Sequence, residues 1–198
     1  MNIQQRFENI YNSSTWRTQF GRTGSGSGTG STPEYCARYL DYLHQIRPRY
    51  ATVLDLGCGD WHLYRDFDWG SRYTGVDIVP SVIAANRENH PEHTWVCADI
   101  LTYPIRHELV LLKDVAQHWT DDEIEQWIKR LRRSRFRTAL VTNNWRHHRT
   151  PALNGTPRDI NNKYSWAPVD FTKYGFKTVL YYPQGKFKQV ARLDRKDM

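Results

Sequence analysis

The chain has 198 residues and a formal net charge of +7, and hydrophobic residues make up 39% of it. This length fits one domain with a sizeable core, and the composition excludes a disordered chain. No apolar run approaches the ~20 residues of a membrane helix, and no secretory signal is visible at the N-terminus. We therefore expect a soluble, cytoplasmic protein. The three cysteines form no CxxC pair, so we expect no metal site.

The N-terminal region predicts a helix, a loop and a second helix. Ile3, Phe7 and Ile10 fall on one face of a short amphipathic helix. Residues 21–32 are rich in glycine and serine, which is typical of a flexible loop or linker. Pro33 then opens a helix that Pro48 ends. We therefore separate residues 1–32 from a main domain of residues 33–198.

The main domain alternates short strands with helices. Strands are predicted at residues 52–56, 73–77, 94–98, 108–113 and 137–142. One helix runs from Pro80 to about Asn89, and another follows Thr120 and Glu123, which form a capping box. Residues 144–174 are irregular, and residues 177–182 and 186–193 predict a closing hairpin. This order predicts an α/β fold, with a parallel sheet and helices on both faces.

The end of the first predicted strand is the most informative segment. Gly57 and Gly59 allow the backbone to turn tightly and to approach a ligand. Asp77 ends the next strand, 20 residues after Gly57, where a carboxylate can accept hydrogen bonds from ribose hydroxyls. An adenosine-type ligand is the working hypothesis, and a structural turn with a capping aspartate is the alternative.

The same segment argues against a ligand with a diphosphate. A dinucleotide site favours a third glycine where this chain has His62, and Asp60 would repel a diphosphate. S-adenosylmethionine has a ribose but no phosphate, and its sulfonium is cationic. The carboxylates of Asp55, Asp60 and Asp99 would favour that positive charge.

Four segments together resemble the successive motifs of the class I S-adenosylmethionine-dependent methyltransferases. They are VLDLGCGDW at 53–61, YTGVDI at 73–78, ADI at 98–100 and LLKDVAQHW at 111–119. The resemblance covers residues 33–143 and implies a Rossmann-like, mostly parallel seven-stranded sheet with an antiparallel last strand. It also implies S-adenosyl-L-methionine as cofactor and S-adenosyl-L-homocysteine as product.

The resemblance also implies roles for individual residues. Gly57, Cys58 and Gly59 would line the methionine moiety, Asp77 and the adjoining Ile78 would hold the ribose, and Asp99 and Ile100 would bracket the adenine. Lys113 and Asp114 would face the methyl group. Tyr11, Trp16 and the Gly/Ser loop would close over the cofactor as a lid, by analogy with small members of the family; an untethered loop is the alternative.

For the chemistry we single out Asp114 and His118 as candidate catalytic residues. An acceptor that must lose a proton needs a base with a pKa near neutrality, and histidine meets that need. His118 follows the fourth strand; its alternative role is to pack in a loop or on the substrate. Asp114 would contact the cofactor or the acceptor, or else cap a turn. We expect Gln117, Trp119, Asn143 and Arg158 to bind the acceptor.

Motifs that the sequence lacks limit the chemical classes of methyl acceptor. The fourth strand lacks the Pro-Pro-aromatic signature of exocyclic-amine nucleic-acid methyltransferases, and no cysteine follows a proline. We therefore expect a small or medium, anionic acceptor, such as a small molecule or a glycan, methylated on oxygen or nitrogen. A nucleic-acid methyltransferase and a catalytically silent cofactor-binding module are the alternatives.

The distribution of charge leaves the nucleic-acid alternative open. Residues 1–99 carry 9 basic and 11 acidic side chains, whereas residues 100–198 carry 19 and 10. The densest basic run, residues 129–137, either complements the dipole at the end of a helix or attracts a polyanion.

Overall fold

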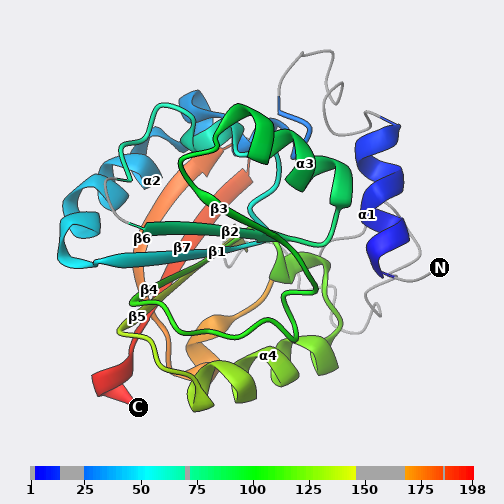
Figure 1. Cartoon of the computed structure of the whole chain (residues 1–198). Coiled ribbons are helices and arrows are strands. Elements are labelled where there is room, and N and C mark those ends of the chain that lie inside the picture. The colour runs from blue at the N-terminus through cyan, green and yellow to red at the C-terminus, as the bar shows by residue number, and fades with distance from the viewer. Residues whose placement is uncertain (1–2, 14–24, 70–71, 146–167, 185) are drawn as a thin grey trace. The chain divides into compact units, whose positions relative to one another are not determined.

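The computed structural model describes residues 3–13, 25–69, 72–145, 168–184 and 186–198 (Figure 1). Its seven strands form one mixed sheet in the order β3-β2-β1-β4-β5-β7-β6, in which β7 is antiparallel to β5 and β6. This confirms the predicted fold class, a Rossmann-like sheet with a reversed last strand. The chain separates into two compact units, residues 1–103 and 104–198. No helix among the described residues is long and apolar enough to cross a membrane.

The first unit contains three parallel strands with β2 between β1 and β3. Proline occupies the first turn of both α2 and α3, where its missing N–H costs no helical hydrogen bond. The predicted boundaries of the three strands and of α3 agree with the structure to within one residue, whereas α2 ends at Ile46, two residues before Pro48. The elements are α1 (Ile3–Asn12), α2 (Pro33–Ile46), β1 (Thr52–Leu56), β2 (Arg72–Asp77), α3 (Pro80–Asn89) and β3 (Thr94–Cys97).

Aromatic side chains fill much of the core of this unit. The Trp61 ring packs against Tyr73 of β2 and Trp95 of β3, with centroid distances of 5.8 and 5.5 Å. Gly75 of β2 makes room for this cluster, because a Cβ built there would lie 2.5 Å from the Trp95 ring. The glycine inside the strand is thus explained by close packing rather than by a turn.

The second unit contains the parallel pair β4 and β5 and the antiparallel pairs of β7. Its strand β5 continues to Trp145, beyond the predicted end at residue 142, because β7 pairs with it as far as Trp145. Strand β6 likewise includes Pro183 and Gln184, which the sequence analysis placed in the turn of the hairpin. The elements are β4 (Leu109–Lys113), α4 (Asp121–Arg133), β5 (Thr138–Trp145), β6 (Lys177–Gln184) and β7 (Lys186–Asp194).

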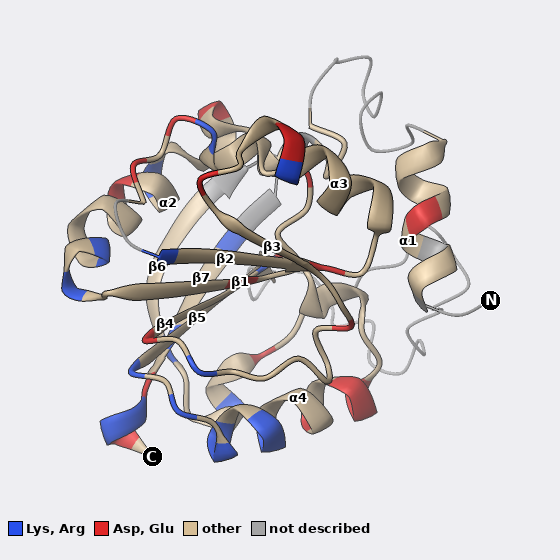
Figure 2. Cartoon of the chain, in the orientation of Figure 1, with Lys and Arg blue, Asp and Glu red and all other residues tan. Residues whose placement is uncertain are grey.

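Helix α4 begins with the predicted capping box. Thr120 Oγ1 accepts a hydrogen bond from the Glu123 N–H at 3.2 Å, and Glu123 Oε2 accepts one from the Thr120 N–H at 2.7 Å. The predicted apolar stripe is buried, including Trp127 and Leu131. The first turn is acidic and the last turn is basic (Figure 2), which complements the helix dipole at both ends.

Candidate functional site

The residues singled out from the sequence fall into two groups, one in each unit. In the first unit, the chain turns sharply after β1, and both Gly57 and Gly59 have positive φ angles of 77° and 57°. The Gly59 carbonyl accepts a hydrogen bond from Asn86 Nδ2 of α3 at 2.8 Å. A Cβ at Gly59 would lie 2.1 Å from Ser27 Oγ. Residue 59 therefore has to be glycine, for its backbone angle and for its close packing.

Asp77 ends β2 beside this glycine turn. Its side chain is buried, with Oδ2 accepting a hydrogen bond from the Gly59 N–H at 3.0 Å and Oδ1 accepting one from the Val79 N–H at 3.1 Å. Burial raises the pKa of the Asp77 carboxyl above its ordinary value, although the backbone amides oppose the shift. The site is thus a buried carboxylate held by amide dipoles, an environment that a cationic or hydrogen-bond-donating ligand would complement.

Two other predicted cofactor residues lie close to the turn. Asp55 of β1 is buried and accepts a hydrogen bond from the Tyr73 hydroxyl at 2.7 Å. Cys58 is also buried, and burial raises the pKa of its thiol, so the side chain stays protonated at neutral pH. Asp55 therefore also stabilises the fold through Tyr73, and Cys58 is also part of the buried core, in addition to the cofactor contacts predicted for both residues.

The residues predicted to bracket the adenine follow β3. The Asp99 side chain accepts a hydrogen bond from the Leu101 N–H at 2.9 Å and so stabilises the turn in which Ile100 is buried. Ile78 follows Asp77 directly and is half-buried. Trp16, the remaining predicted cofactor residue, lies outside the described residues.

Part of the Gly/Ser-rich loop packs on the glycine turn. Residues 25–28, which we call the N-terminal strap, contact the Asp60 carboxylate through Ser25 Oγ at 2.7 Å, the Gly26 N–H at 2.5 Å and Ser27 Oγ at 3.1 Å. The Tyr11 hydroxyl of α1 shares a 2.7 Å hydrogen bond with Ser27 Oγ. Glycine and serine composition predicts a flexible loop, yet these residues are fixed by a carboxylate 35 positions away from Ser25.

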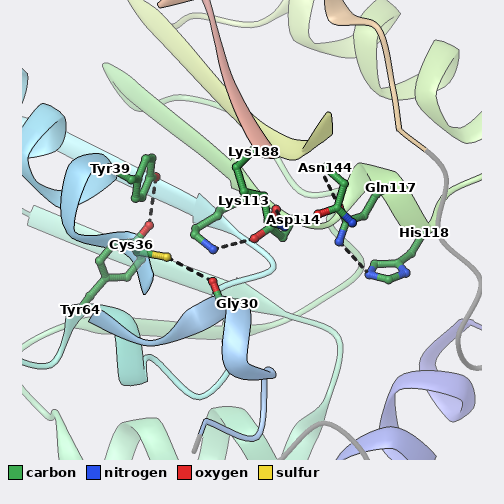
Figure 3. A network of polar contacts seen from close by, with 10 residues as sticks. All are labelled: Gly30, Cys36, Tyr39, Tyr64, Lys113, Asp114, Gln117, His118, Asn144 and Lys188. Carbon is green, nitrogen blue, oxygen red and sulfur yellow. Dashed lines mark hydrogen bonds and ion pairs between the residues drawn. The ribbon is translucent and has the colours of Figure 1, made fainter. Parts of the chain in front are cut away.

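The chain after the strap is also tied to the first unit. The Gly30 carbonyl accepts a hydrogen bond from the Cys36 thiol of α2 at 3.2 Å (Figure 3). A separate contact of α2 joins the Tyr39 hydroxyl to the Tyr64 hydroxyl at 3.1 Å (Figure 3). Ser27 of the strap is therefore held by α1 through Tyr11, and Gly30, two residues after the strap, is held by α2 through Cys36.

In the second unit, Asp114 follows β4 and is the centre of a charge cluster. The Lys113 ammonium donates to Asp114 Oδ2 and the Lys188 ammonium of β7 donates to Oδ1, each at 2.7 Å (Figure 3). The exposed fractions of these side chains are 6% for Lys113, 14% for Asp114 and 7% for Lys188. Burial alone would raise the pKa of the Asp114 carboxyl, but the two ammonium groups outweigh it and hold that pKa below its ordinary value.

His118 lies at the end of a polar relay. The Asn144 N–H of β5 donates to Gln117 Oε1 at 3.1 Å. This contact fixes the orientation of the Gln117 amide, whose nitrogen lies 3.3 Å from His118 Nε2 (Figure 3). Because an amide nitrogen can only donate, His118 Nε2 accepts in this arrangement. The relay thus favours a neutral imidazole with its proton on Nδ1 and its lone pair on Nε2.

The predicted acceptor-binding residues have different surroundings. Trp119 is 1% exposed and packs against Trp127 of α4, so it belongs to the core of the second unit. Asn143 of β5 is fully buried; its Oδ1 accepts a hydrogen bond from the Val169 N–H at 2.9 Å, and among the described residues its Nδ2 has no partner. Arg158 lies outside the described residues. No group of three metal-binding side chains occurs within the described ranges.

Three polar residues in these two groups were not assigned a site role from the sequence. Lys188 contacts Asp114 from 74 positions away, Asn86 holds the glycine turn, and Ser25 anchors the strap. Each contact joins segments that are distant in the chain. No local pattern marks Lys188 or Asn86, and the Gly/Ser pattern around Ser25 predicts a loop or lid but not its contact with Asp60. Only the reversal of β7, which the resemblance implies, pointed to the strand that carries Lys188.

Comparisons with known proteins agree with this description. The family described as "Methyltransferase domain" matches residues 53–135. No curated protein is significantly similar in sequence to this chain.

Three solved structures illustrate the shared fold. Magnesium protoporphyrin IX methyltransferase from Synechocystis PCC 6803 with bound SAM has a TM-score of 0.66 at 15% identity, and the match covers 98% of each chain. The N-methyltransferase NodS from Bradyrhizobium japonicum WM9 in complex with S-adenosyl-L-homocysteine has a TM-score of 0.61 at 13% identity, covering 96% of each. The methyltransferase domain of bacterial CtHen1 has a TM-score of 0.58 at 18% identity, covering 82% of this chain and 98% of the other. The domain match therefore identifies a methyltransferase domain at residues 53–135, and the chain has the fold of these S-adenosylmethionine-dependent methyltransferases.

Proposed function

We propose that the chain transfers a methyl group from S-adenosylmethionine to a small or medium, anionic acceptor, on oxygen or nitrogen. The observation that carries the proposal is the glycine turn with the buried Asp77 carboxylate beside it. The proposal assigns cofactor binding to the first unit and the acceptor's chemistry to the second.

The residues of the first unit fit the cofactor. The Asp77 carboxylate accepts two backbone N–H groups and keeps further lone pairs for ribose hydroxyls. Its raised pKa reflects a buried negative charge, which a cationic ligand would stabilise. When bound, S-adenosylmethionine supplies an electrophilic methyl group, whose carbon–sulfur bond breaks as the acceptor's lone pair forms the new bond.

The residues of the second unit suit the acceptor. The low pKa of Asp114 means that its carboxylate stays ionised at neutral pH and orients the acceptor by accepting a hydrogen bond, rather than taking its proton. The His118 Nε2 lone pair accepts from the Gln117 amide in the relay, and it serves as the base for an acceptor that must lose a proton once that acceptor's N–H or O–H replaces the Gln117 amide at Nε2. An acceptor that is already anionic at the reacting atom requires no base.

A second candidate function is methylation of a nucleic acid, and the basic end of α4 favours it. Arg132 and Arg133 of α4 and Arg135 after it are exposed, and the C-terminal end of α4 is rich in Lys and Arg (Figure 2). Guanidinium groups bind phosphate well, and binding through phosphates weakens steeply with salt. A nucleic acid that binds with strong salt dependence and takes up the methyl group would favour this candidate.

Incubation with methyl-labelled S-adenosylmethionine and cell extract tests the proposal. We expect label in small molecules or glycans, and background label with Asp77→Ala. Label in nuclease-sensitive material would favour the second candidate. Cofactor binding in a calorimetric titration, without label in any fraction, would favour a silent binding module. Absence of cofactor binding would contradict the proposal, because the glycine turn and Asp77 would then have another purpose.

A further inference from the structure

A buried lysine on the last strand is a feature that the methyl-transfer proposal has not used. Lys188 lies on β7, opposite Asn144 of β5, and its side chain is only 7% exposed. Lysine is rarely buried to this extent unless its charge is paired. Its ammonium pairs with Asp114 Oδ1 at 2.7 Å, although the two residues are 74 positions apart. The reversed strand thus delivers a positive charge to the end of β4.

Lys188 and Lys113 hold the two oxygens of one carboxylate. Lys113 occupies Oδ2 and Lys188 occupies Oδ1, so neither oxygen can rotate away without losing an ion pair. The backbone of Asp114 is also constrained, with a left-handed φ of 59° and a 2.7 Å hydrogen bond from its N–H to the Thr142 carbonyl. A residue other than glycine adopts this φ only where its surroundings compensate for the strain.

We propose that Lys188 is a positioning residue for methyl transfer, which acts through Asp114. It keeps the Asp114 carboxylate ionised and in one orientation, so that the carboxylate serves as a fixed hydrogen-bond acceptor for the methyl acceptor. This inference rests on the proposed function. It assigns the proton of the acceptor to His118, because a carboxylate paired with two ammonium groups is a weak base.

Lys113 alone would not have the same effect. It precedes Asp114 in the chain and reaches one oxygen, which leaves Oδ1 dependent on Lys188. The charged groups that the structure places against Asp114 are Lys113 of β4 and Lys188 of β7. Loss of Lys188 would leave a buried, half-paired carboxylate, which takes up a proton more readily and turns more freely.

Titration of Asp114 by NMR tests the inference without an identified acceptor. Aspartate labelled with ¹³C at Cγ is incorporated, and the Asp114 signal is assigned by its loss in Asp114→Asn. We expect a midpoint below the ordinary aspartate range in the wild type, a rise of about 1–3 pH units in Lys188→Met and restoration in Lys188→Arg, since a nearby opposite charge shifts a carboxyl pKa by that amount. Lys177→Met is the matched control, because Lys177 is on the adjoining strand β6 and pairs with Asp197 instead.

Methyl transfer to the labelled fraction provides the second readout. Lys188→Met should lower kcat by about tenfold or more, as expected for lost orientation, and leave the cofactor Kd unchanged, whereas Lys188→Arg should recover most of the rate. An unchanged Asp114 midpoint in Lys188→Met, or an unchanged kcat, would overturn the inference.

If Lys188→Met does not fold, the titration of the wild-type protein still tests the inference. An Asp114 midpoint at or above the ordinary aspartate range would contradict the role given to Lys188. Failure of the proposed function has a different signature. The wild-type protein would then not bind S-adenosylmethionine, while the Asp114 titration would remain measurable.

Discussion

Asp77 of the first unit and Asp114 of the second are both buried, and each lies at the end of a parallel strand, yet their pKa values shift in opposite directions. Burial raises the pKa of Asp77, which has backbone amides as its hydrogen-bond donors. For Asp114, burial is outweighed by Lys113 and Lys188, and the pKa is lowered. The balance between burial and the charge of its partners therefore decides the direction of a buried acid's pKa shift.

The same contrast separates the tasks that the two units would perform. Among the described residues, the donors to the Asp77 carboxylate are neutral backbone amides and the nearby Asp60 is also negative, so a cationic ligand would improve its environment. Asp114 already has its counter-charges within the protein, so it is suited to fixed orientation rather than to capture of a cation. This comparison predicts that changes near Asp77 alter cofactor affinity, whereas changes near Asp114 alter turnover.

His118→Ala should have the largest effect on turnover. If His118 Nε2 takes the acceptor's proton, its loss should lower kcat by about 10²–10⁴-fold, the range for general-base catalysis. The cofactor Kd, measured by calorimetric titration, should not change, because the change leaves the first unit's glycine turn intact. His118→Gln is the matched variant: it keeps a polar side chain without a basic lone pair. Full activity of His118→Gln would show that the residue only packs on its surroundings.

Asp77→Ala should weaken cofactor binding and leave turnover nearly unchanged, the opposite of His118→Ala. Loss of hydrogen bonds to a charged group costs about 1.5–3 kcal/mol, so the cofactor Kd should rise by about 10- to 150-fold. At saturating cofactor, kcat should change much less. A Kd equal to that of the wild type would contradict the placement of the ribose at Asp77 and would remove the basis of the comparison.

The two acids also predict opposite responses to pH. Because its folded-state pKa is raised, Asp77 contributes stability that is present below the ordinary aspartate pKa and is lost as pH rises through the raised value. Because its folded-state pKa is lowered, Asp114 contributes stability that is present above the ordinary pKa and is lost as pH falls through the lowered value. Urea unfolding from pH 3 to 7 of Asp77→Asn and Asp114→Asn should therefore change the slope of stability against pH in opposite senses.

The pH dependence of cofactor affinity also tests the charge state of Asp77. A protonated Asp77 would no longer attract a sulfonium, so cofactor affinity should fall as pH decreases through the raised pKa. Asp77→Asn should bind more weakly at neutral pH and show a smaller dependence on pH. Equal pH dependence of the two proteins would assign the effect to another group.

The sequence was sufficient for features that depend on neighbouring residues. Pro80 sets the start of α3, Thr120 and Glu123 set the start of α4, and the glycine motif predicts the turn after β1. These signals are local, because a cap or a turn is completed within a few residues of the chain. Local signals also explain why the ends of β1, β2, β3 and β4 were predicted to within one residue.

The sequence was insufficient where partners are distant. The contact of Ser25 with Asp60 and the contact of Lys188 with Asp114 join positions 35 and 74 apart. The composition of the strap even predicts flexibility, since glycine and serine lack the side chains that would mark a packed segment. The extra length of β5 likewise depends on its pairing with β7 and has no local signal.

Ser25→Ala should produce a smaller effect, limited to the first unit. Ser25 Oγ donates to a carboxylate, but Gly26 and Ser27 would still hold Asp60, so we expect a cost of about 1.5 kcal/mol. Faster hydrogen exchange of the strap amides would measure it. Ser31→Ala, in the same segment but without a contact to Asp60, is the control. If the strap acts as a lid, cofactor release should also accelerate; equal exchange rates in both variants would contradict the anchoring role of Asp60.

Thr120→Ala should have the smallest effect and separates stability from chemistry. The change removes the side-chain half of the capping box and should cost about 1 kcal/mol, which lowers Tm by about 2–4 °C in a chain of this size. Thr120→Ser keeps the hydroxyl and should retain most of the stability. Because His118 lies two residues before the cap, the same variants show whether the helix start also positions the base. A kcat that falls in Thr120→Ala and recovers in Thr120→Ser, at a temperature where both proteins are folded, would extend the positioning role from β7 to α4; an unchanged kcat would confine it to the residues around Asp114.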